Sequence, residues 1–256
     1  MAVVLAGGCR VSAMQEGTPE VRGPLRIWPQ VGRRVGAEAI SLRVLEFAPG
    51  RSPALRNAEC DEIFYVLSGA ATVHIAGRAY PVGPETGLYL RPGATLSVTN
   101  PGPAPLVLIS SQCPEPLAGA ETGPARTAQP ATAKPPAHEP IARLADRAAV
   151  PTADRWYRVL VDTEIGNTQV TQFVGSIPPG RAPDHFHHYE EVLFILRGTG
   201  RMWAGATSTP ISAGSCIYLP KRQVHCVENT GADELRLLGV FYPAGSPSVR
   251  YESTGE

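Results

Sequence analysis

An internal repeat constrains the fold of this 256-residue chain more than any other feature. Four pairs of identical residues share one offset of 129 positions: Glu62 and Glu191, Gly69 and Gly198, Asn100 and Asn229, Leu106 and Leu235. Pro92 and Pro220 differ by 128, which requires one residue of slack within a turn. A shared register over this length predicts a tandem duplication of a unit of roughly 100 residues.

Both copies have a sequence pattern that is typical of short β-strands. Runs such as EIFYVLSG and EVLFILRG are rich in β-branched and aromatic residues and are bounded by glycine, proline or asparagine. The chain has 26 glycines and 26 prolines, enough for many turns. This spacing of strands and turns predicts an all-β sandwich or barrel. One short helix is expected, over residues 141–150 (IARLADRAAV).

The two copies are separated by a segment of different composition. Residues 113–140 hold seven prolines and many alanines, without an alternating apolar pattern, and are predicted to form a Pro/Ala-rich linker. The predicted domains are an N-terminal extension with a lead-in strand at 1–37, an upstream barrel at 38–112, the linker at 113–140 and a downstream barrel at 141–256.

Charge and cysteine content exclude several classes of protein. The 23 basic residues balance the 23 acidic ones, so a general binder of nucleic acid or of anionic membranes is not expected. No apolar run approaches the length of a membrane span. Five scattered cysteines predict reduced thiols and a cytoplasmic location. The apolar stretch before Cys9 lacks the basic start of a signal peptide, and Met14 is an alternative start.

One segment of the downstream copy carries the residues of a metal site. In DHFHHYEEVLFILRG, His185, His187 and Glu191 all occupy odd positions, so in an extended strand they share one face, whereas Glu190 points the other way. Two imidazoles and a carboxylate on a face that continues as hydrocarbon are costly to bury unless a cation satisfies them. His225 is the further histidine of this copy that completes the predicted site.

This set of ligands predicts a divalent transition metal. Imidazole and carboxylate suit iron(II), manganese, nickel, copper or zinc. We expect iron(II) first and manganese(II) second, with nickel and zinc as further candidates. Three histidines and one glutamate leave two positions open in an octahedral sphere, through which a substrate can reach the metal.

The two motifs of the downstream copy resemble those of the cupin family. The first, G-x5-H-x-H-x3-E-x6-G, is similar to Gly180, His185, His187, Glu191 and Gly198, with one residue fewer after the first glycine. The second, G-x5-P-x-G-x2-H-x3-N, is similar to Gly214, Pro220, His225 and Asn229, with Arg222 where the pattern has glycine. The resemblance implies two tandem jelly-roll barrels, a bicupin, over about 38–111 and 155–243, and the four named His and Glu side chains as metal ligands.

The upstream copy lacks this set of ligands. Projecting the ligands back by 129 gives Arg56, Ala58, Glu62 and Leu96, of which only the glutamate can coordinate a metal. An upstream barrel without a metal is therefore expected, in which Arg56 pairs with Glu62. The alternative is that Arg56 binds an anionic ligand.

A substrate pocket is expected beside the metal. Its candidate residues are Gln172, Met202, Trp203, Tyr218 and Phe241, because a ligand cavity is mostly apolar with a few placed polar groups. Gln172 shares its strand face with the valines at 170 and 174. Its amide would point to the metal only if that face, and not the opposite one, is the inner face.

These observations predict a metal-dependent enzyme that acts on a small organic molecule. An oxidative, dioxygenase-like reaction is preferred, because no separate base is evident once the histidines and the glutamate are fixed. The alternatives are a non-catalytic metal-dependent binding or sensor protein, or a bicupin isomerase, decarboxylase or amidohydrolase. A small-molecule substrate is the expected partner, with no nucleic acid and no membrane, and the chain is expected to be a monomer or a homodimer.

Overall fold

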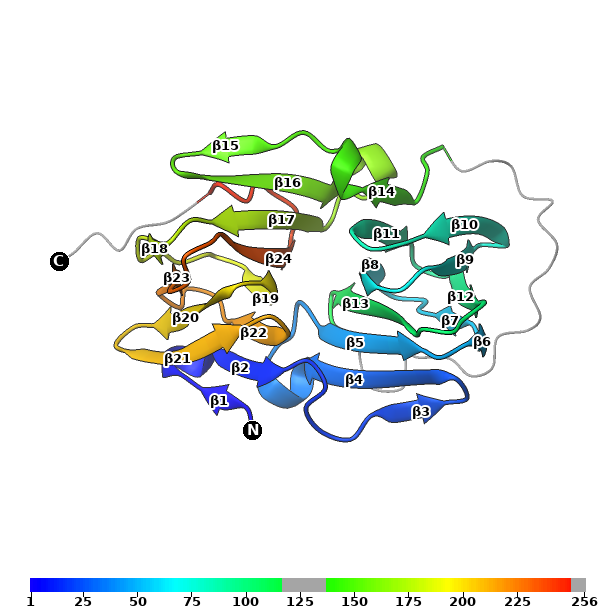
Figure 1. The fold of residues 1–256 in the computed structure, drawn as a ribbon, viewed down its shortest axis with the longest axis horizontal. Coiled ribbons are helices and arrows are strands. Elements are labelled where there is room, and N and C mark those ends of the chain that lie inside the picture. The colour runs from blue at the N-terminus through cyan, green and yellow to red at the C-terminus, as the bar shows by residue number, and fades with distance from the viewer. Residues whose placement is uncertain (117–136, 250–256) are drawn as a thin grey trace.

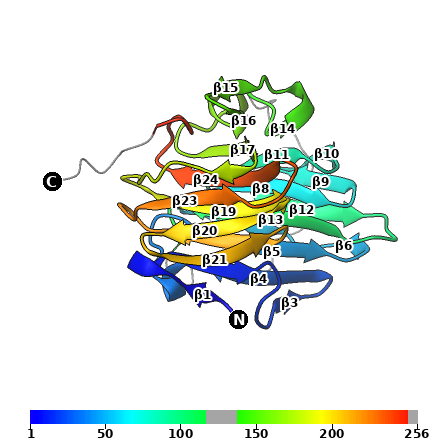
Figure 2. The same ribbon diagram turned by 60° about the vertical axis from the view of Figure 1, so that its left-hand side comes forward.

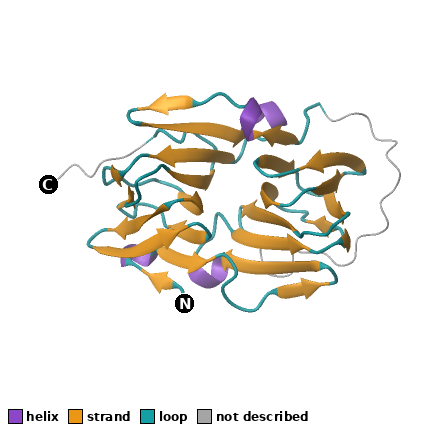
Figure 3. Cartoon of the chain, viewed as in Figure 1, coloured by secondary structure: helices purple, strands orange, loops and turns teal. Residues whose placement is uncertain are grey.

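The computed structural model describes residues 1–116 and 137–249, which form strands almost throughout (Figure 1). Helical structure among these residues is limited to four short 3-10 turns (Figure 3): η1 (Ala6–Gly8), η2 (Arg33–Val35), η3 (Leu144–Asp146) and η4 (Thr163–Ile165). None of the helices in these two ranges has the length and hydropathy to cross a membrane. The predicted all-β class is confirmed.

The upstream barrel consists of two sheets. Its larger sheet has the order β14 (Ile141–Arg143), β11 (Thr86–Leu90), β8 (Asp61–Ser68), β13 (Leu106–Cys113), β5 (Leu42–Phe47), β4 (Leu25–Val31) and β3 (Glu20–Arg22). Its smaller sheet has the order β10 (Arg78–Val82), β9 (Ala71–Ile75), β12 (Thr95–Asn100) and β6 (Gly50–Arg51), with β7 (Leu55–Arg56) also paired to β12. All pairings are antiparallel, as in a jelly roll.

The downstream barrel repeats this plan (Figure 2). Its larger sheet has the order β1 (Val3–Val4), β2 (Arg10–Ala13), β22 (Ser215–Leu219), β19 (Glu190–Arg197), β24 (Leu235–Tyr242), β17 (Thr171–Ile177), β16 (Arg155–Val161) and β15 (Val150–Thr152). Its smaller sheet has the order β18 (Gly180–Arg181), β23 (His225–Asn229), β20 (Thr199–Ala204) and β21 (Thr207–Ser212).

Each barrel also contains strand segments from the other half of the chain. β2 pairs with β22, with Arg10 opposite Tyr218, so the N-terminus extends the downstream sheet. β14 pairs with β11, with Leu88 opposite Ile141, so the segment after the linker begins in the upstream sheet. Hydrogen-bonded pairing thus crosses the domain boundaries predicted from the sequence. Residues 117–136, most of the predicted linker, lie outside the described residues.

The helix expected at residues 141–150 is not formed. The segment instead contains β14, the single turn η3 and the start of β15. Ala142 and Leu144 are buried in the cluster that joins the two barrels. Pairing with the exposed edge of β11 therefore overrides the helix propensity of this alanine-rich stretch.

Three apolar clusters hold the chain together. One fills the upstream barrel around Phe47 and Phe64, and one fills the downstream barrel around Ile195 and Phe241. The third lies between the barrels, where the large sheets pack against each other through residues such as Phe194. Because both faces of these central strands are buried, their sequences are continuous apolar runs and do not alternate.

The repeated asparagines, Asn100 and Asn229, make equivalent hydrogen bonds in the two barrels. The Asn100 amide donates to the carbonyl of Phe47 at 3.0 Å and to that of Ala104 at 2.9 Å. The Asn229 amide donates to Ile177 at 2.9 Å and to Asp233 at 2.8 Å. The asparagines therefore tie the loops before β13 and β24 to the ends of β5 and β17. The duplication predicted from the offset is visible at the level of single hydrogen bonds.

Candidate metal centre and cavity

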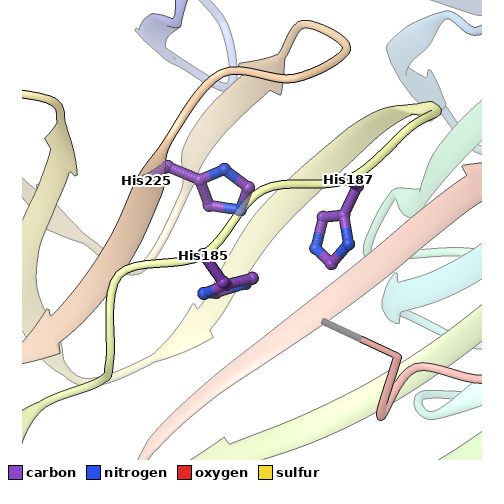
Figure 4. Close-up of side chains that lie close together, drawn as sticks. All are labelled: His185, His187 and His225. Atoms are coloured by element: carbon purple, nitrogen blue, oxygen red, sulfur yellow. The ribbon is translucent and has the colours of Figure 1, made fainter. Parts of the chain in front are cut away.

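Three imidazoles meet at one end of the downstream barrel (Figure 4). His185 and His187 lie on the loop before β19, and His225 is the first residue of β23. One ring nitrogen from each of the three histidines lies within 4.8 Å of the other two. The sequence pattern brings these three side chains together as expected.

The local backbone differs from the single strand expected over residues 185–191. β19 begins only at Glu190. His185 instead forms an isolated bridge with His225, in which each backbone N–H donates to the other's carbonyl, at 3.1 and 2.8 Å. The bridge aligns two of the histidines across the smaller sheet, so their placement depends on backbone pairing between distant segments.

Hydrogen bonds fix the tautomers of two histidines. Nδ1 of His185 lies 3.0 Å from the carbonyl of Pro183, and Nδ1 of His225 lies 2.7 Å from the carbonyl of Gln223. A carbonyl only accepts, so each Nδ1 carries the proton and each Nε2 keeps its lone pair. Metal-binding histidines are typically held in this way.

Glu191 lies beside the histidine cluster in a buried position. Its carboxylate is 3.4 Å from Nε2 of His187, and burial raises its pKa to about 8. Burial, followed by the charge of His185, lowers the pKa of His225 to about 4. A site that disfavours the carboxylate anion and the imidazolium alike is satisfied by a cation that both groups can ligate.

The spacing of the donors fits one ion. Metal–nitrogen bonds of about 2.1 Å allow two ligand atoms on one ion to be about 4.2 Å apart at most. The spread of 4.8 Å among the three imidazoles exceeds this by a few tenths of an ångström. Rotation of an imidazole about its side-chain bonds covers such a difference. The three imidazoles therefore fit a divalent metal, and Glu191 lies next to this cluster, 3.4 Å from His187, without being part of it.

The neighbouring carboxylate, Glu190, points away from this cluster. It accepts from the backbone N–H of Ala39 at 2.8 Å and of Glu38 at 3.1 Å, across the interface between the barrels. The alternation of side chains along the strand predicts this separation of the two glutamates.

Arg222 holds the turn opposite His187. Its φ of 62° lies in the left-handed region that favours glycine, the residue of the cupin pattern at this position. Its N–H donates to the carbonyl of His187 at 2.7 Å. The backbone therefore keeps the shape of the motif, although the side chain departs from it.

A cavity of about 110 Å³ extends from the four candidate ligands through the barrel. Its walls are mainly apolar and include Tyr157, Phe173, Ile177, Val227 and Leu237. Thr152, Arg155, Trp156 and Pro247 also line it. A Cβ on Gly239 would come within 2.3 Å of the Phe173 ring, so this glycine makes room for the aromatic wall.

None of the five residues predicted for a substrate pocket lines this cavity. Met202 and Phe241 are buried in the barrel core, and the Trp203 indole donates to Glu228 at 2.7 Å. Tyr218 donates to the carbonyl of Gly36 at 3.3 Å, and Gln172 packs near Gly87, both at the contact with the other barrel. Phe173, not Gln172, occupies the inner face of β17.

Several residues of the cavity were missed from the sequence. Phe173 was identifiable as the alternative inward residue of its strand, and Tyr157 shares the inner face of β16 with Val159. Arg155 and Thr152 lie on a hairpin outside both sequence motifs, and only the fold brings that hairpin to the cavity.

The upstream barrel contains an ion pair, but with a different arginine. Glu62 accepts from Arg43, from the Ser110 hydroxyl at 2.7 Å and from the Gln112 amide at 3.2 Å. Arg56 is exposed and donates to the carbonyl of Gly93 at 3.0 Å. The predicted pair between Arg56 and Glu62 is therefore wrong, because β5 places Arg43 closer to the carboxylate.

All five cysteines are buried, and none forms a disulfide. Cys226 points away from the metal cluster, and its sulfur accepts from Nε of Arg181 at 3.2 Å.

Comparison with known proteins gives matches to both copies. A family model described as "Cupin domain" matches residues 43–111 and 173–241. Auxin-binding protein 1 of Arabidopsis thaliana is 32% identical over 86 residues, which are 30% of this chain and 43% of that protein. An oxalate-binding protein of Thermotoga maritima is 34% identical over 68 residues, 26% of this chain and 56% of that protein. The chain thus spans about half the length of the curated relatives it matches.

Similarity to solved structures extends over both barrels. Oxalate decarboxylase from Bacillus subtilis superposes with a TM-score of 0.72 at 15% identity, covering 91% of this chain and 76% of that one. A further oxalate decarboxylase structure gives a TM-score of 0.73 at 16% identity, covering 92% of this chain and 77% of that one. At this identity the likeness concerns the fold: two jelly-roll barrels in one chain.

Proposed function

Because the chain belongs to the cupin family and carries two cupin domains in tandem, we propose that it is a metal-dependent enzyme acting on a small organic molecule in its downstream barrel. The observation that carries the proposal is the convergence of His185, His187 and His225 within 4.8 Å, with Glu191 beside them and a cavity of about 110 Å³ leading to them. The proposed cofactor is a divalent transition metal, with iron(II) first, manganese(II) second, and nickel or zinc as further candidates.

The protein's own groups prepare the site in three ways. Carbonyls at Pro183 and Gln223 hold two histidines in the tautomer that offers Nε2. Glu191 contributes a carboxylate whose negative charge a cation would stabilise. The apolar walls keep the space beside these groups low in water, which strengthens electrostatic interactions there. A bound divalent metal supplies Lewis-acid or redox chemistry at its open positions.

We propose an oxidative, dioxygenase-like reaction as the first reaction class. Among the described residues that line the cavity, the four candidate ligands are the only histidines and carboxylates. A reaction that depends on a separate general base has no evident residue to supply it. A reaction between a metal-bound substrate and dioxygen depends least on such a base.

Decarboxylation or simple binding of a short dicarboxylate is the second candidate. It is favoured by the likeness of the fold to oxalate decarboxylase and by the relative named as an oxalate-binding protein. In this case a metal held by the same four side chains would bind the carboxylate ligand, with or without turnover.

The test begins with elemental analysis of the natively purified chain. The metal-loaded protein is then tested for oxygen uptake with diketones, flavonols, aromatic diols and hydroxy acids, and for formate and carbon dioxide release from oxalate. Uptake with one substrate class, lost in His187→Ala and kept in Glu190→Ala, supports the oxidative proposal. Release from oxalate without uptake supports the second candidate. A chain that binds no divalent metal contradicts both.

A further inference from the structure

The cavity has a second polar end, distant from the histidines. Resting on the proposed function above, we propose that the ligand is a small organic acid whose carboxylate pairs with Arg155, while an oxygen donor at its other end reaches the histidine cluster. The two ends are joined by an apolar segment.

Arg155 is the cation of the cavity. Among the described lining residues it is the one side chain with a permanent positive charge. The side chain is only 14% exposed, yet the bond from Nε to the Asp154 carboxylate, at 2.9 Å, is the one hydrogen bond of its guanidinium within residues 1–116 and 137–249. A largely buried guanidinium with terminal nitrogens available is a site for a planar oxyanion, which it binds with two parallel hydrogen bonds.

Arg155 lines the cavity, and the strand register agrees with this position. Residues of equal parity share a face, and Tyr157 and Val159 on the same strand pack into the core of the downstream barrel. Thr152 pairs directly with Arg155 across the hairpin, so its hydroxyl projects from the same face. The end of the cavity therefore offers a guanidinium and a hydroxyl side by side.

The same register separates this end from the metal end. Trp156 pairs with Ser176, which places Arg155 beside Ile177, four residues along β17 from Phe173. At about 3.3 Å per residue, the distance along the sheet from the level of Arg155 to the level of Phe173 is about 13 Å. Glu191 lies at the opposite end, since it pairs with Phe241, which in turn pairs with Thr171. A ligand spanning the cavity would be polar at both ends and apolar between.

The probes are linear dicarboxylates from oxalate to suberate and the monomethyl esters of the longer ones. Each is titrated calorimetrically into the full chain loaded with zinc, a redox-silent metal. We expect one of the longer diacids to bind more tightly than oxalate. We expect Arg155→Gln to weaken that diacid at least tenfold and to leave its half-ester unchanged, because the half-ester has no second carboxylate for Arg155. Lys221→Gln, which removes an exposed cation after Pro220, is the matched control and should bind like the wild type.

Two results would overturn the inference: a half-ester that binds the wild type as tightly as its diacid, or an Arg155→Gln variant that keeps wild-type affinity for every diacid. Failure of the proposed function has a different signature. If His187→Ala, which should take up no zinc, still binds the diacid as the wild type does, the metal takes no part in binding, whatever Arg155 does.

Discussion

The guanidinium of Arg181 donates from Nε to the sulfur of Cys226 at 3.2 Å and from Nη2 to Asp184 at 3.0 Å. It also lies over the Trp203 ring, 4.4 Å from the ring centroid. Asp184 precedes His185 in the chain, and Cys226 follows His225. One side chain therefore braces both segments of the backbone bridge that carries two candidate metal ligands.

This brace predicts that Arg181→Met weakens metal binding without unfolding the chain. Loss of an outer contact that orients ligands typically costs about 10–100-fold in metal affinity. The measurement is zinc affinity by competition with a chromophoric chelator. Arg201→Met is the control, since Arg201 lies 5.9 Å from the same Trp203 ring but bonds to Ser208. Equal affinities in the two variants would show that Arg181 does not position the ligands.

A second prediction concerns Arg222, whose backbone has the left-handed conformation that favours glycine. Arg222→Gly should raise the free energy of unfolding by about 0.5–1 kcal/mol, since the left-handed conformation is costly with a Cβ and free for glycine. Metal affinity should stay the same, because the N–H that holds the His187 carbonyl is kept.

Arg222→Pro is the matched opposite of that change. Proline has no N–H to donate to His187 and cannot adopt a φ of 62°, so both stability and zinc affinity should fall. Urea unfolding and zinc titration of the two variants provide the check. A glycine variant less stable than the wild type would mean that the arginine side chain contributes contacts of its own.

Breaking the buried ion pair between Arg43 and Glu62 in the upstream barrel should lower the free energy of unfolding. Glu62→Gln leaves Arg43 without its counter-charge, which should destabilise the chain by about 3–5 kcal/mol. The double variant Arg43→Met with Glu62→Leu should lose less than either single variant, because no unpaired charge remains. Arg56→Met, on an exposed side chain, should change stability by less than about 0.5 kcal/mol. If the Arg56 variant is the more damaging one, the ion pair is assigned to the wrong arginine.

The same ion pair shows where sequence reasoning succeeds and where it stops. The offset of 129 aligns Glu62 with Glu191, and both lie on the inner faces of equivalent strands. The offset does not hold for β5 and β17. Phe47 of β5 pairs with Leu106, and Ile177 of β17 pairs with Leu235, so these two equivalent residues are 130 positions apart. Arg43 thus corresponds to Phe173, and a fixed offset could not show that one barrel has a charge where the other has an aromatic wall.

The candidate ligands were predictable because they are close in sequence or belong to a motif, and alternation alone separates Glu191 from Glu190. The rest of the site was not. Arg155 reaches the cavity through a hairpin whose position depends on pairing between distant strands, and the N-terminal β2 joins the downstream barrel across more than 200 residues of chain. Pairing of this kind has no local signal in the sequence.

Metal binding itself should stabilise the folded chain, and variants of His187 and Glu190 can show on which side of the strand the metal binds. Zinc at about one hundred times its dissociation constant adds about 2.7 kcal/mol to the free energy of unfolding. His187→Ala should lose this increment, because it removes a ligand from the cluster.

Glu190→Ala should show the same rise in the free energy of unfolding with zinc as the wild type, but its free energy of unfolding without zinc should be lower. Its carboxylate accepts the N–H groups of Glu38 and Ala39 at the interface between the barrels, and leaving buried donors unsatisfied costs about 1–3 kcal/mol. Thermal and urea unfolding, each with and without zinc, separate the two effects. A Glu190 variant that loses the increment while the His187 variant retains it would place the ion on the other face of the strand, between the barrels, and the cavity would then have no metal at its end.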